Sequence, residues 1–133
     1  MPEERVALAR RLIERFNRRD IAGIKEITVE NAEIVPMRAA LEGTVFRGPT
    51  AVDDFFEASD DSWEEVRMYV DEISEHGDRV LAVGRLQGRA HETGMEIDSP
   101  MGWVVTFGDG KIASVRTYVS VAEAREAAER GAE

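Results

Sequence analysis

The spacing of apolar residues changes from a helical period to a strand period part-way along the 133-residue chain. In the first part, apolar residues recur at intervals of three and four, which predicts an amphipathic helix over residues 5–17. These residues are Val6, Ala9, Leu12, Ile13 and Phe16. In the second part, segment 66–70 alternates apolar and polar residues, which is typical of a half-buried strand. Helices that lead into an antiparallel sheet predict an α+β domain in which the sheet wraps the helices.

Capping and turn residues mark the elements that follow the first helix. Asp20 is a suitable N-cap for a short second helix, and Gly48-Pro49 places a proline in the first turn of a third. Between these helices, residues 32–37 are predicted to form a strand that its proline ends or bends. Residues 41–47 are predicted as a loop or a hairpin arm, and residues 59–62 as a turn.

Glycine-containing turns divide the second half into a four-strand meander. The turn sequences are His76-Gly77-Asp78 and Gly108-Asp109-Gly110. The predicted strands are 66–70, 80–86, 101–107 and 112–119. Ser120 and Glu123 match a capping box for a closing helix that ends at Gly131. No repeat or linker interrupts this order.

Composition excludes several classes of function. The chain has no cysteine, so disulfides and cysteine-ligated metal sites are excluded. Its net charge of −10 disfavours nucleic acid as a partner, because phosphate backbones are repelled. No apolar run is long enough to span a membrane, and the charged start lacks a signal-peptide pattern. We therefore expect a cytoplasmic protein without membrane contact.

Three short segments carry a resemblance to a known superfamily. They are residues 18–24 (RRDIAGI), 46–52 (FRGPTAV) and 107–118, which begins FGDGKI and ends RTY. The chain resembles, over nearly its whole length, the nuclear-transport-factor-2-like superfamily with its SnoaL-like polyketide cyclases, ketosteroid isomerases and limonene-epoxide hydrolases. The resemblance implies one SnoaL-like domain over residues 1–133. In it, a cone-shaped curved antiparallel sheet wraps the N-terminal helices (a cystatin-like roll), with an added C-terminal helix. The fold hosts many chemistries and some pure binders, so it does not fix the activity.

The same resemblance implies an apolar pocket between the sheet and the helices. On the sheet, the inward residues would be Leu86, Met101, Trp103, Val115, Thr117 and Val119. On the helical side, they would be Leu12, Phe16, Val52 and Phe55. Pro36 and Arg38 share a face of the early strand, and Arg38 would stand either at the pocket mouth as an anion anchor or in solvent without a ligand. The small residues Ala82 and Gly84 would leave space. For each residue taken singly, the alternative is a position in a filled core.

The catalytic groups of the best-known relatives are missing from the matching positions. For a ketosteroid isomerase, the base position falls on Pro36, the tyrosine position on Leu12 and the protonated-acid position on Trp103. For a limonene-epoxide hydrolase, Arg85-Leu86-Gln87 lacks the Arg-x-Asp pair, and the late aspartate position falls on Thr117. Neither activity is therefore expected. A strand register shifted by one residue would reverse this conclusion by turning Glu33 or Asp98 into the pocket.

The remaining polar residues give weak signals. The chain has no phosphate-binding or dinucleotide-binding glycine motif, so no cofactor is predicted. His76 lies in a turn, and His91-Glu92 has no second histidine nearby, so no metal site is predicted. Trp103 is predicted to be buried, where its indole N–H needs an acceptor, either on the backbone or on a ligand.

Three functions fit this sequence. The first is a protein that holds an apolar, polyketide- or terpene-like small molecule, with or without cyclase-like chemistry. The second is a non-catalytic dimeric module with a collapsed pocket. The third is an isomerase, hydrolase or cyclase that uses other residues, such as His91 or Glu33. A homodimer is expected through the outward sheet face, on which Arg85, Arg116 and Tyr118 should lie.

Overall fold

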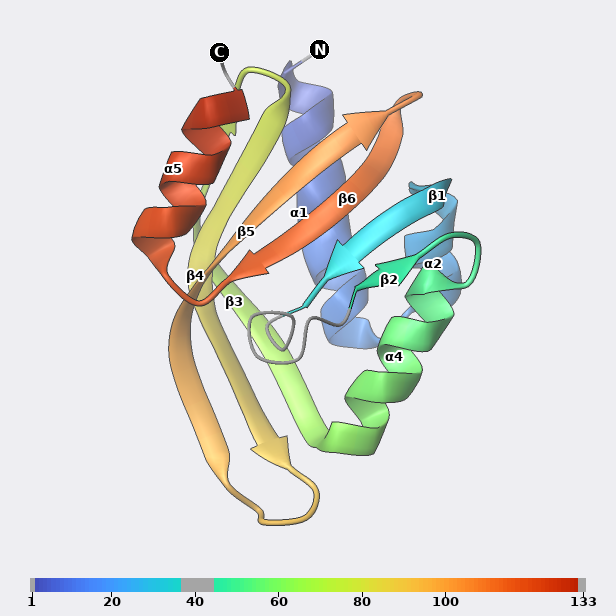
Figure 1. The fold of residues 1–133 in the computed structure, drawn as a ribbon, viewed down its shortest axis with the longest axis vertical. Helices are drawn as coiled ribbons and strands as arrows, with labels where there is room; N and C mark the ends of the chain where they lie inside the picture. The colour runs from blue at the N-terminus through green and yellow to red at the C-terminus, as the bar shows by residue number, and fades with distance from the viewer. Residues whose placement is uncertain (1, 37–44, 132–133) are drawn as a thin grey trace.

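A curved six-stranded sheet with helices on both faces forms the fold (Figure 1). The computed structural model describes residues 2–36 and 45–131. In chain order, the elements are α1 (Pro2–Arg18), α2 (Ile21–Glu26), β1 (Thr28–Val35), β2 (Phe46–Arg47), α4 (Ala51–Ser62), β3 (Trp63–His76), β4 (Arg79–Ala90), β5 (Glu96–Gly108), β6 (Lys111–Tyr118) and α5 (Val121–Gly131). This order confirms the predicted α+β class, with its early helices, its meander and its closing helix.

The sheet has the strand order β2-β1-β6-β5-β4-β3. Strands β3 to β6 form the predicted antiparallel meander. Strand β1, however, runs parallel to β6 and antiparallel to β2, so the sheet is mixed and not antiparallel throughout. The reason is the crossover. The segment with β2 and α4 carries the chain from β1 to the far edge of the sheet, and the meander then returns to β1 in the parallel direction.

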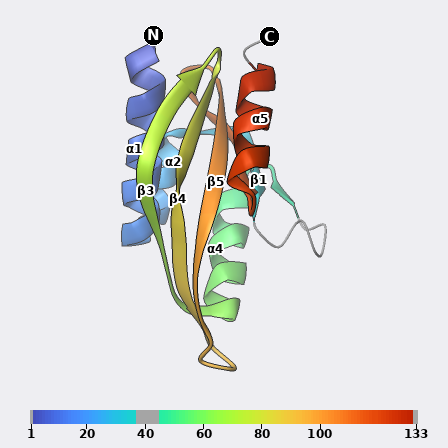
Figure 2. The same ribbon diagram turned by 90° about the vertical axis from the view of Figure 1, so that its left-hand side faces the viewer.

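The two sheet faces are covered by different helices. Helices α1 and α5 lie on opposite sides of strands β3–β5 (Figure 2). We call the face toward α1, α2 and α4 the inner face and the face toward α5 the outer face. Side chains alternate between the faces along each strand, so Trp103 joins the inner core while Val104 packs under α5. None of the described helices is long and apolar enough to cross a membrane.

The curvature of the sheet has a visible origin in β3 and β4. Asp71 is an extra residue in β3, because Val70 pairs with Gly84 while Glu72 pairs with Val83. Such a bulge bends the strand and increases its twist. A Cβ at Gly84 would lie 1.8 Å from the Tyr69 carbonyl oxygen. The space that the sequence analysis left for a ligand at Gly84 is therefore filled by the backbone of β3.

Asn17 attaches α1 to the exposed edge of the sheet. Its side-chain amide donates to the Met68 carbonyl oxygen at 2.8 Å, and its Oδ1 accepts from the Met68 N–H at 2.8 Å. Strand β3 is an edge strand, so this pair of hydrogen bonds replaces those of a missing neighbour. It also holds the neighbouring Phe16 against the inner face of the sheet, in the same core cluster as Met68.

Local expectations at helix ends and turns are mostly confirmed. Asp20 Oδ1 accepts from the Gly23 N–H at 3.0 Å, and Ser120 Oγ accepts from the Glu123 N–H at 3.2 Å. The β5–β6 turn has positive φ at Asp109 and Gly110 (53° and 77°), as its Asp-Gly sequence predicts.

Several predicted boundaries were wrong. Pro49 lies before the third helix and not in its first turn, because α4 begins at Ala51 after the N-cap Thr50. Residues 59–62 form the last turn of α4 and not a turn between elements, because packing of the helix overrides the weak propensity of Ser and Asp. Strands β3, β4 and β5 are also longer than predicted. The ends of β4 and β5 next to their shared turn carry charged pairs such as Arg89–Glu96. These residues therefore lack the apolar spacing by which strands are recognised.

We predict that Gly102→Ala destabilises the protein by about 1–3 kcal/mol, because the fold has no room for the added methyl group. A Cβ at Gly102 would lie 2.3 Å from the Ala124 Cβ of α5. At Gly108 in the same strand, the nearest atom would be at an ordinary 3.8 Å, so Gly108→Ala should stay within about 0.5 kcal/mol of the parent. Urea unfolding of both variants provides the measurement. Equal midpoints would contradict close packing of α5 on β5.

Candidate functional site

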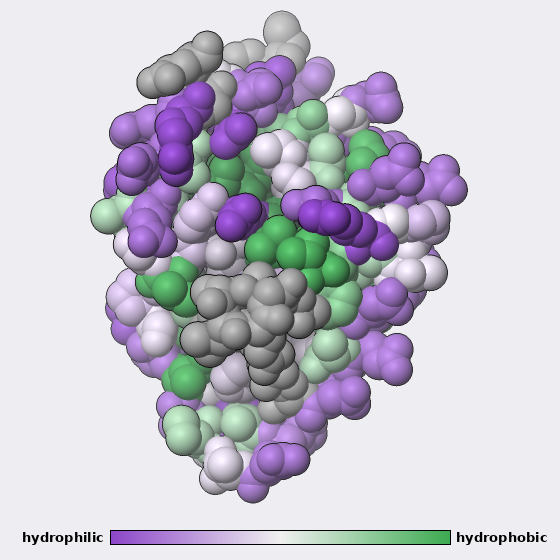
Figure 3. Space-filling model, viewed as in Figure 1, coloured by the Kyte–Doolittle hydropathy of each residue, from purple (hydrophilic) through white to green (hydrophobic). Residues whose placement is uncertain are grey.

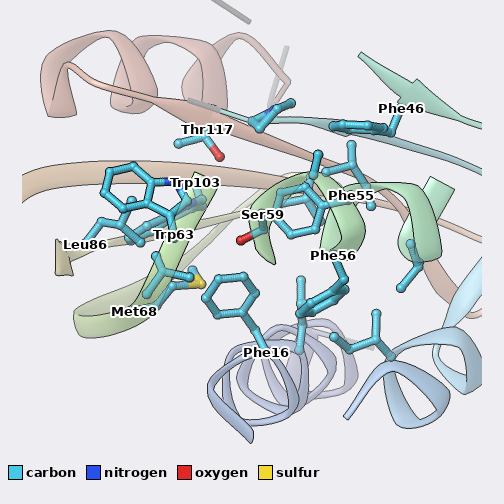
Figure 4. A pocket seen from close by; sticks show the side chains of 18 residues that line it. Phe16, Phe46, Phe55, Phe56, Ser59, Trp63, Met68, Leu86, Trp103 and Thr117 are labelled. Atoms are coloured by element: carbon cyan, nitrogen blue, oxygen red, sulfur yellow. The ribbon is translucent and has the colours of Figure 1, made fainter. Parts of the chain in front are cut away.

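An apolar cavity of about 230 Å³ lies between the inner face of the sheet and the helices. Its walls come from α1, α2 and α4 on one side and from all six strands on the other. Figure 4 shows aromatic side chains on several sides of this space. Because both the sheet and the helices contribute, the cavity exists only in the assembled fold.

Most of the predicted pocket residues are brought together around this cavity. Those that line it are Leu12, Phe16, Pro36, Val52, Phe55, Leu86, Trp103, Val115 and Thr117. Trp103 is only 4% exposed, as predicted.

Two predicted pocket residues do not line the cavity, and a third was not described. Met101 points to the inner face but is packed within the core. It pairs with Gly84, the residue that the β3 backbone approaches closely. Val119 is 54% exposed, because β6 ends at Tyr118 and the alternation of the strand stops there. Arg38 lies outside the described residues.

Several lining residues were missed by the sequence analysis. They include Phe46, Phe56, Ser59, Trp63, Val66 and Met68. Val66 and Met68 could have been assigned to the inner face from their alternation in the sequence. Trp63 could not have been found, because its place depends on how far α4 extends and on Gly88. A Cβ at Gly88 would lie 3.1 Å from the Trp63 ring.

Four phenylalanines form one continuous aromatic wall. The ring centroids of Phe55 and Phe56 are 5.4 Å apart in an edge-to-face arrangement. Phe16 lies 5.8 Å from Phe56, and Phe46 lies 6.0 Å from Phe55. Contacts of this kind add to the energy of burial and hold the rings in place. The wall is therefore preorganised rather than collapsed into the cavity.

A few polar atoms interrupt the apolar lining. The hydroxyl oxygens of Ser59 and Thr117 point into the cavity (Figure 4). Within the described residues, neither hydroxyl has a hydrogen-bond partner, and the same holds for the indole N–H of Trp103. That Nε1 atom is not fully buried, so it remains accessible from the cavity. The backbone acceptor considered for Trp103 is thus not present in this part of the chain.

The described lining contains no carboxylate, histidine, lysine or arginine. Glu33 instead pairs with Arg47 at 2.9 Å. Asp98 accepts from Arg85 at 2.6 Å and from Gln87 at 3.0 Å on the outer face. The hydrogen bond from Arg85 holds the pKa of Asp98 below its ordinary value, so this carboxylate is a poor proton acceptor at neutral pH.

The two histidines lie away from the cavity lining. His91 is exposed at the turn between β4 and β5, and the Nε2 atom of His76 is 2.9 Å from Ser74 Oγ. Among the described residues, no three potential ligands cluster to hold a metal ion. The site can thus bind and orient a molecule, but its described walls offer no general base.

Comparison with known proteins places this chain in a family. A sequence model of the SnoaL-like domain matches residues 9–115. The chain belongs to the SnoaL-like domain family. Its fold is that of the nuclear-transport-factor-2-like superfamily, as its sequence resemblance implied. A search of curated proteins found no match to the SnoaL-like chain.

Solved structures similar to this SnoaL-like domain cover almost its full length. An NTF2-like protein of unknown function from Burkholderia pseudomallei is 21% identical, with a TM-score of 0.77 over 94% of this chain and 97% of that one. TerC, crystallised with polyporic acid, is 21% identical, with a TM-score of 0.76 over 92% and 96%. A polyketide cyclase candidate from Xanthomonas campestris is 22% identical, with a TM-score of 0.77 over 92% and 94%. At these identities the likeness establishes the fold.

We predict that Thr117→Val leaves the stability of the SnoaL-like domain unchanged or slightly raised. The Thr117 hydroxyl has no partner among the described residues, so its replacement by a methyl group of similar shape breaks no hydrogen bond. Thr106→Val is the matched control, because Thr106 Oγ1 is hydrogen-bonded to Ser114 Oγ on the outer face. That change should cost about 1 kcal/mol. Thermal unfolding of both variants tests this, and a larger loss for Thr117→Val would show that its hydroxyl is already paired.

Proposed function

We propose that this SnoaL-like domain binds an apolar small molecule, polyketide-like or terpene-like in character, in the cavity between sheet and helices. The observation that carries this proposal is the set of unpartnered polar groups in an otherwise apolar lining, namely Ser59, Trp103 and Thr117. None of these three atoms is fully buried, so a small molecule in the cavity can reach each of them and supply its hydrogen-bond partner. An open cavity that holds such a molecule accounts for these groups better than a filled core.

The proposed role is binding and positioning, without acid–base chemistry of the isomerase or epoxide-hydrolase type. Leu12, Pro36, Trp103 and Thr117 all line the cavity, and none of their side chains accepts a proton at neutral pH. Glu33 and Asp98, the residues that a shifted register would have moved inward, are held by arginines. Any catalysis in such a site would come from holding a flexible substrate in a reactive shape.

The two tryptophans of the chain provide a direct test of binding, because Trp63 and Trp103 both line the cavity. We expect their fluorescence to change when a small molecule released from the natively purified protein is added back. Val115→Phe should weaken that response at least tenfold by filling the cavity, since Val115 lines it. Val119→Phe is the matched control, because Val119 is exposed and outside the lining.

Native mass spectrometry identifies the bound compound in the same preparation. A parent protein that carries no small molecule, together with equal fluorescence responses from Val115→Phe and Val119→Phe, would overturn the binding proposal. The non-catalytic module would then be the better description.

We also propose that two copies associate through the part of the outer face that α5 leaves uncovered. Tyr69 is 44% exposed there, with the Arg67 guanidinium 5.7 Å from its ring centroid. Arg85–Asp98 and Arg89–Glu96 place charges of both signs next to it. On the face shown in Figure 3, hydrophilic residues cover most of the surface, and apolar residues gather mainly near its middle. Tyrosine and arginine are favoured at interfaces, and mixed charges suit a surface that pairs with itself.

This association predicts a homodimer by light scattering at micromolar concentration. Tyr69→Glu should shift the protein to a monomer, because it places a carboxylate in the contact. The control is Glu57→Lys, which changes an exposed charge on α4 on the other side of the sheet. A parent protein that is already monomeric would rule out the dimer.

A further inference from the structure

The volume of the cavity limits the size of its ligand. At about 230 Å³, it is smaller than the roughly 300–1,000 Å³ of pockets that enclose drug-sized molecules. Filled to the density of a protein interior, it holds about 170 Å³ of ligand, which is roughly a dozen non-hydrogen atoms. That is the size of a compound with one or two rings. A four-ring compound does not fit within this volume unless part of it lies outside the cavity or the phenylalanine wall moves, and this wall is held by ring contacts on both sides of Phe55.

The charges of the molecule disfavour an ionic ligand. The described lining has no charged side chain to pair with an anion, and the chain carries a net charge of −10. An ion buried without a partner carries a large desolvation penalty. The indole N–H of Trp103 is a donor only and needs an acceptor, so a ligand whose sole polar group is an ammonium would leave it without a partner.

Two of the unpartnered groups lie next to each other on the sheet. Trp103 on β5 and Thr117 on β6 are directly paired across the antiparallel ladder, and both side chains reach the cavity. In such a pair, the Cβ atoms are about 4.5–5.5 Å apart. One oxygen with two lone pairs can accept from both groups. Ser59 faces this pair from α4 on the other wall.

We infer that the ligand is a neutral compound of one or two rings with a carbonyl oxygen, and that this oxygen accepts hydrogen bonds from Trp103 Nε1 and Thr117 Oγ1. The inference rests on the proposed function, because it names the chemistry of the molecule that the cavity binds. The aromatic wall contacts the ring system, and the Trp103–Thr117 pair determines which end of the ligand points to the sheet. Trp103 and Thr117 are thus positioning and specificity residues.

Four probes separate the parts of this inference when their dissociation constants are measured by calorimetry. The probes are 1-tetralone, a neutral two-ring ketone; tetralin, the same ring system without oxygen; 1-naphthoate, a two-ring anion; and progesterone, a four-ring ketone. We expect 1-tetralone to bind best, with each of the other three at least fivefold weaker. An absent hydrogen bond lowers affinity by roughly 2- to 10-fold, and tetralin lacks two of them.

Two conservative variants test the assigned donors. Thr117→Val and Trp103→Phe should each weaken 1-tetralone binding by roughly 2- to 10-fold and leave tetralin binding unchanged. Thr93→Val is the control, because Thr93 lies in the exposed turn between β4 and β5. Thr117→Val preserves shape and is expected to fold normally, so it decides the question if Trp103→Phe is destabilised.

The outcomes distinguish failure of the inference from failure of the proposed function. Equal binding of tetralin and 1-tetralone, or no effect of Thr117→Val, overturns the assignment of the carbonyl but leaves an apolar binding site. Tighter binding of 1-naphthoate overturns neutrality, and progesterone bound as tightly as 1-tetralone overturns the size limit. If none of the four probes binds, the proposed function itself is overturned, and the inference with it.

Discussion

Strands β3 and β4 approach each other very closely at Gly84. There the Tyr69 carbonyl oxygen occupies the position that a side chain at residue 84 would need, so only glycine permits this contact. The extra residue Asp71 lies beside this contact in β3. Bulge and glycine together bend two of the longest strands of the sheet. The bend makes the inner face concave, and the cavity lies between this face and helices α1, α2 and α4. The cavity is thus a consequence of strand curvature.

The edges and outer face of the sheet are stabilised by a second set of contacts. Asn17 satisfies the free backbone groups of Met68 on the edge strand, which also sets the depth of α1 under the sheet. On the outer face, α5 packs closely because Gly102 faces Ala124. Arg125 of the same helix pairs with Glu72 of β3, and this pairing holds the pKa of Glu72 below its ordinary value. The pair is exposed, so it orients α5 more than it stabilises the fold.

The chemistry of the site follows from where charges are absent and where they are neutralised. The positions that the sequence resemblance matched to acids and bases of related enzymes are apolar or weakly polar, and they line the cavity. The nearby carboxylates Glu33 and Asp98 are bonded to arginines. The polar groups that remain in the lining are hydroxyls and indole N–H groups. Such groups form hydrogen bonds with neutral oxygen atoms of a ligand. Binding selectivity is the property that such a lining supports best.

The sequence by itself determined the order of the elements, their caps and the face that most lining residues occupy. These depend on local spacing, on Asp20 and Ser120 as caps, and on the alternation that puts Trp103, Val115 and Thr117 on one side of the sheet. Only the tertiary structure decided that β1 runs parallel to β6, that α4 extends to Trp63, and that Val119 falls outside the cavity while Met101 is packed in the core. The physical reason is that these features depend on contacts between segments distant in sequence, such as Gly88 beneath the Trp63 ring and Gly84 beneath Tyr69. Local periodicity does not encode such contacts, because a strand pattern fixes which side a residue faces but not what lies opposite.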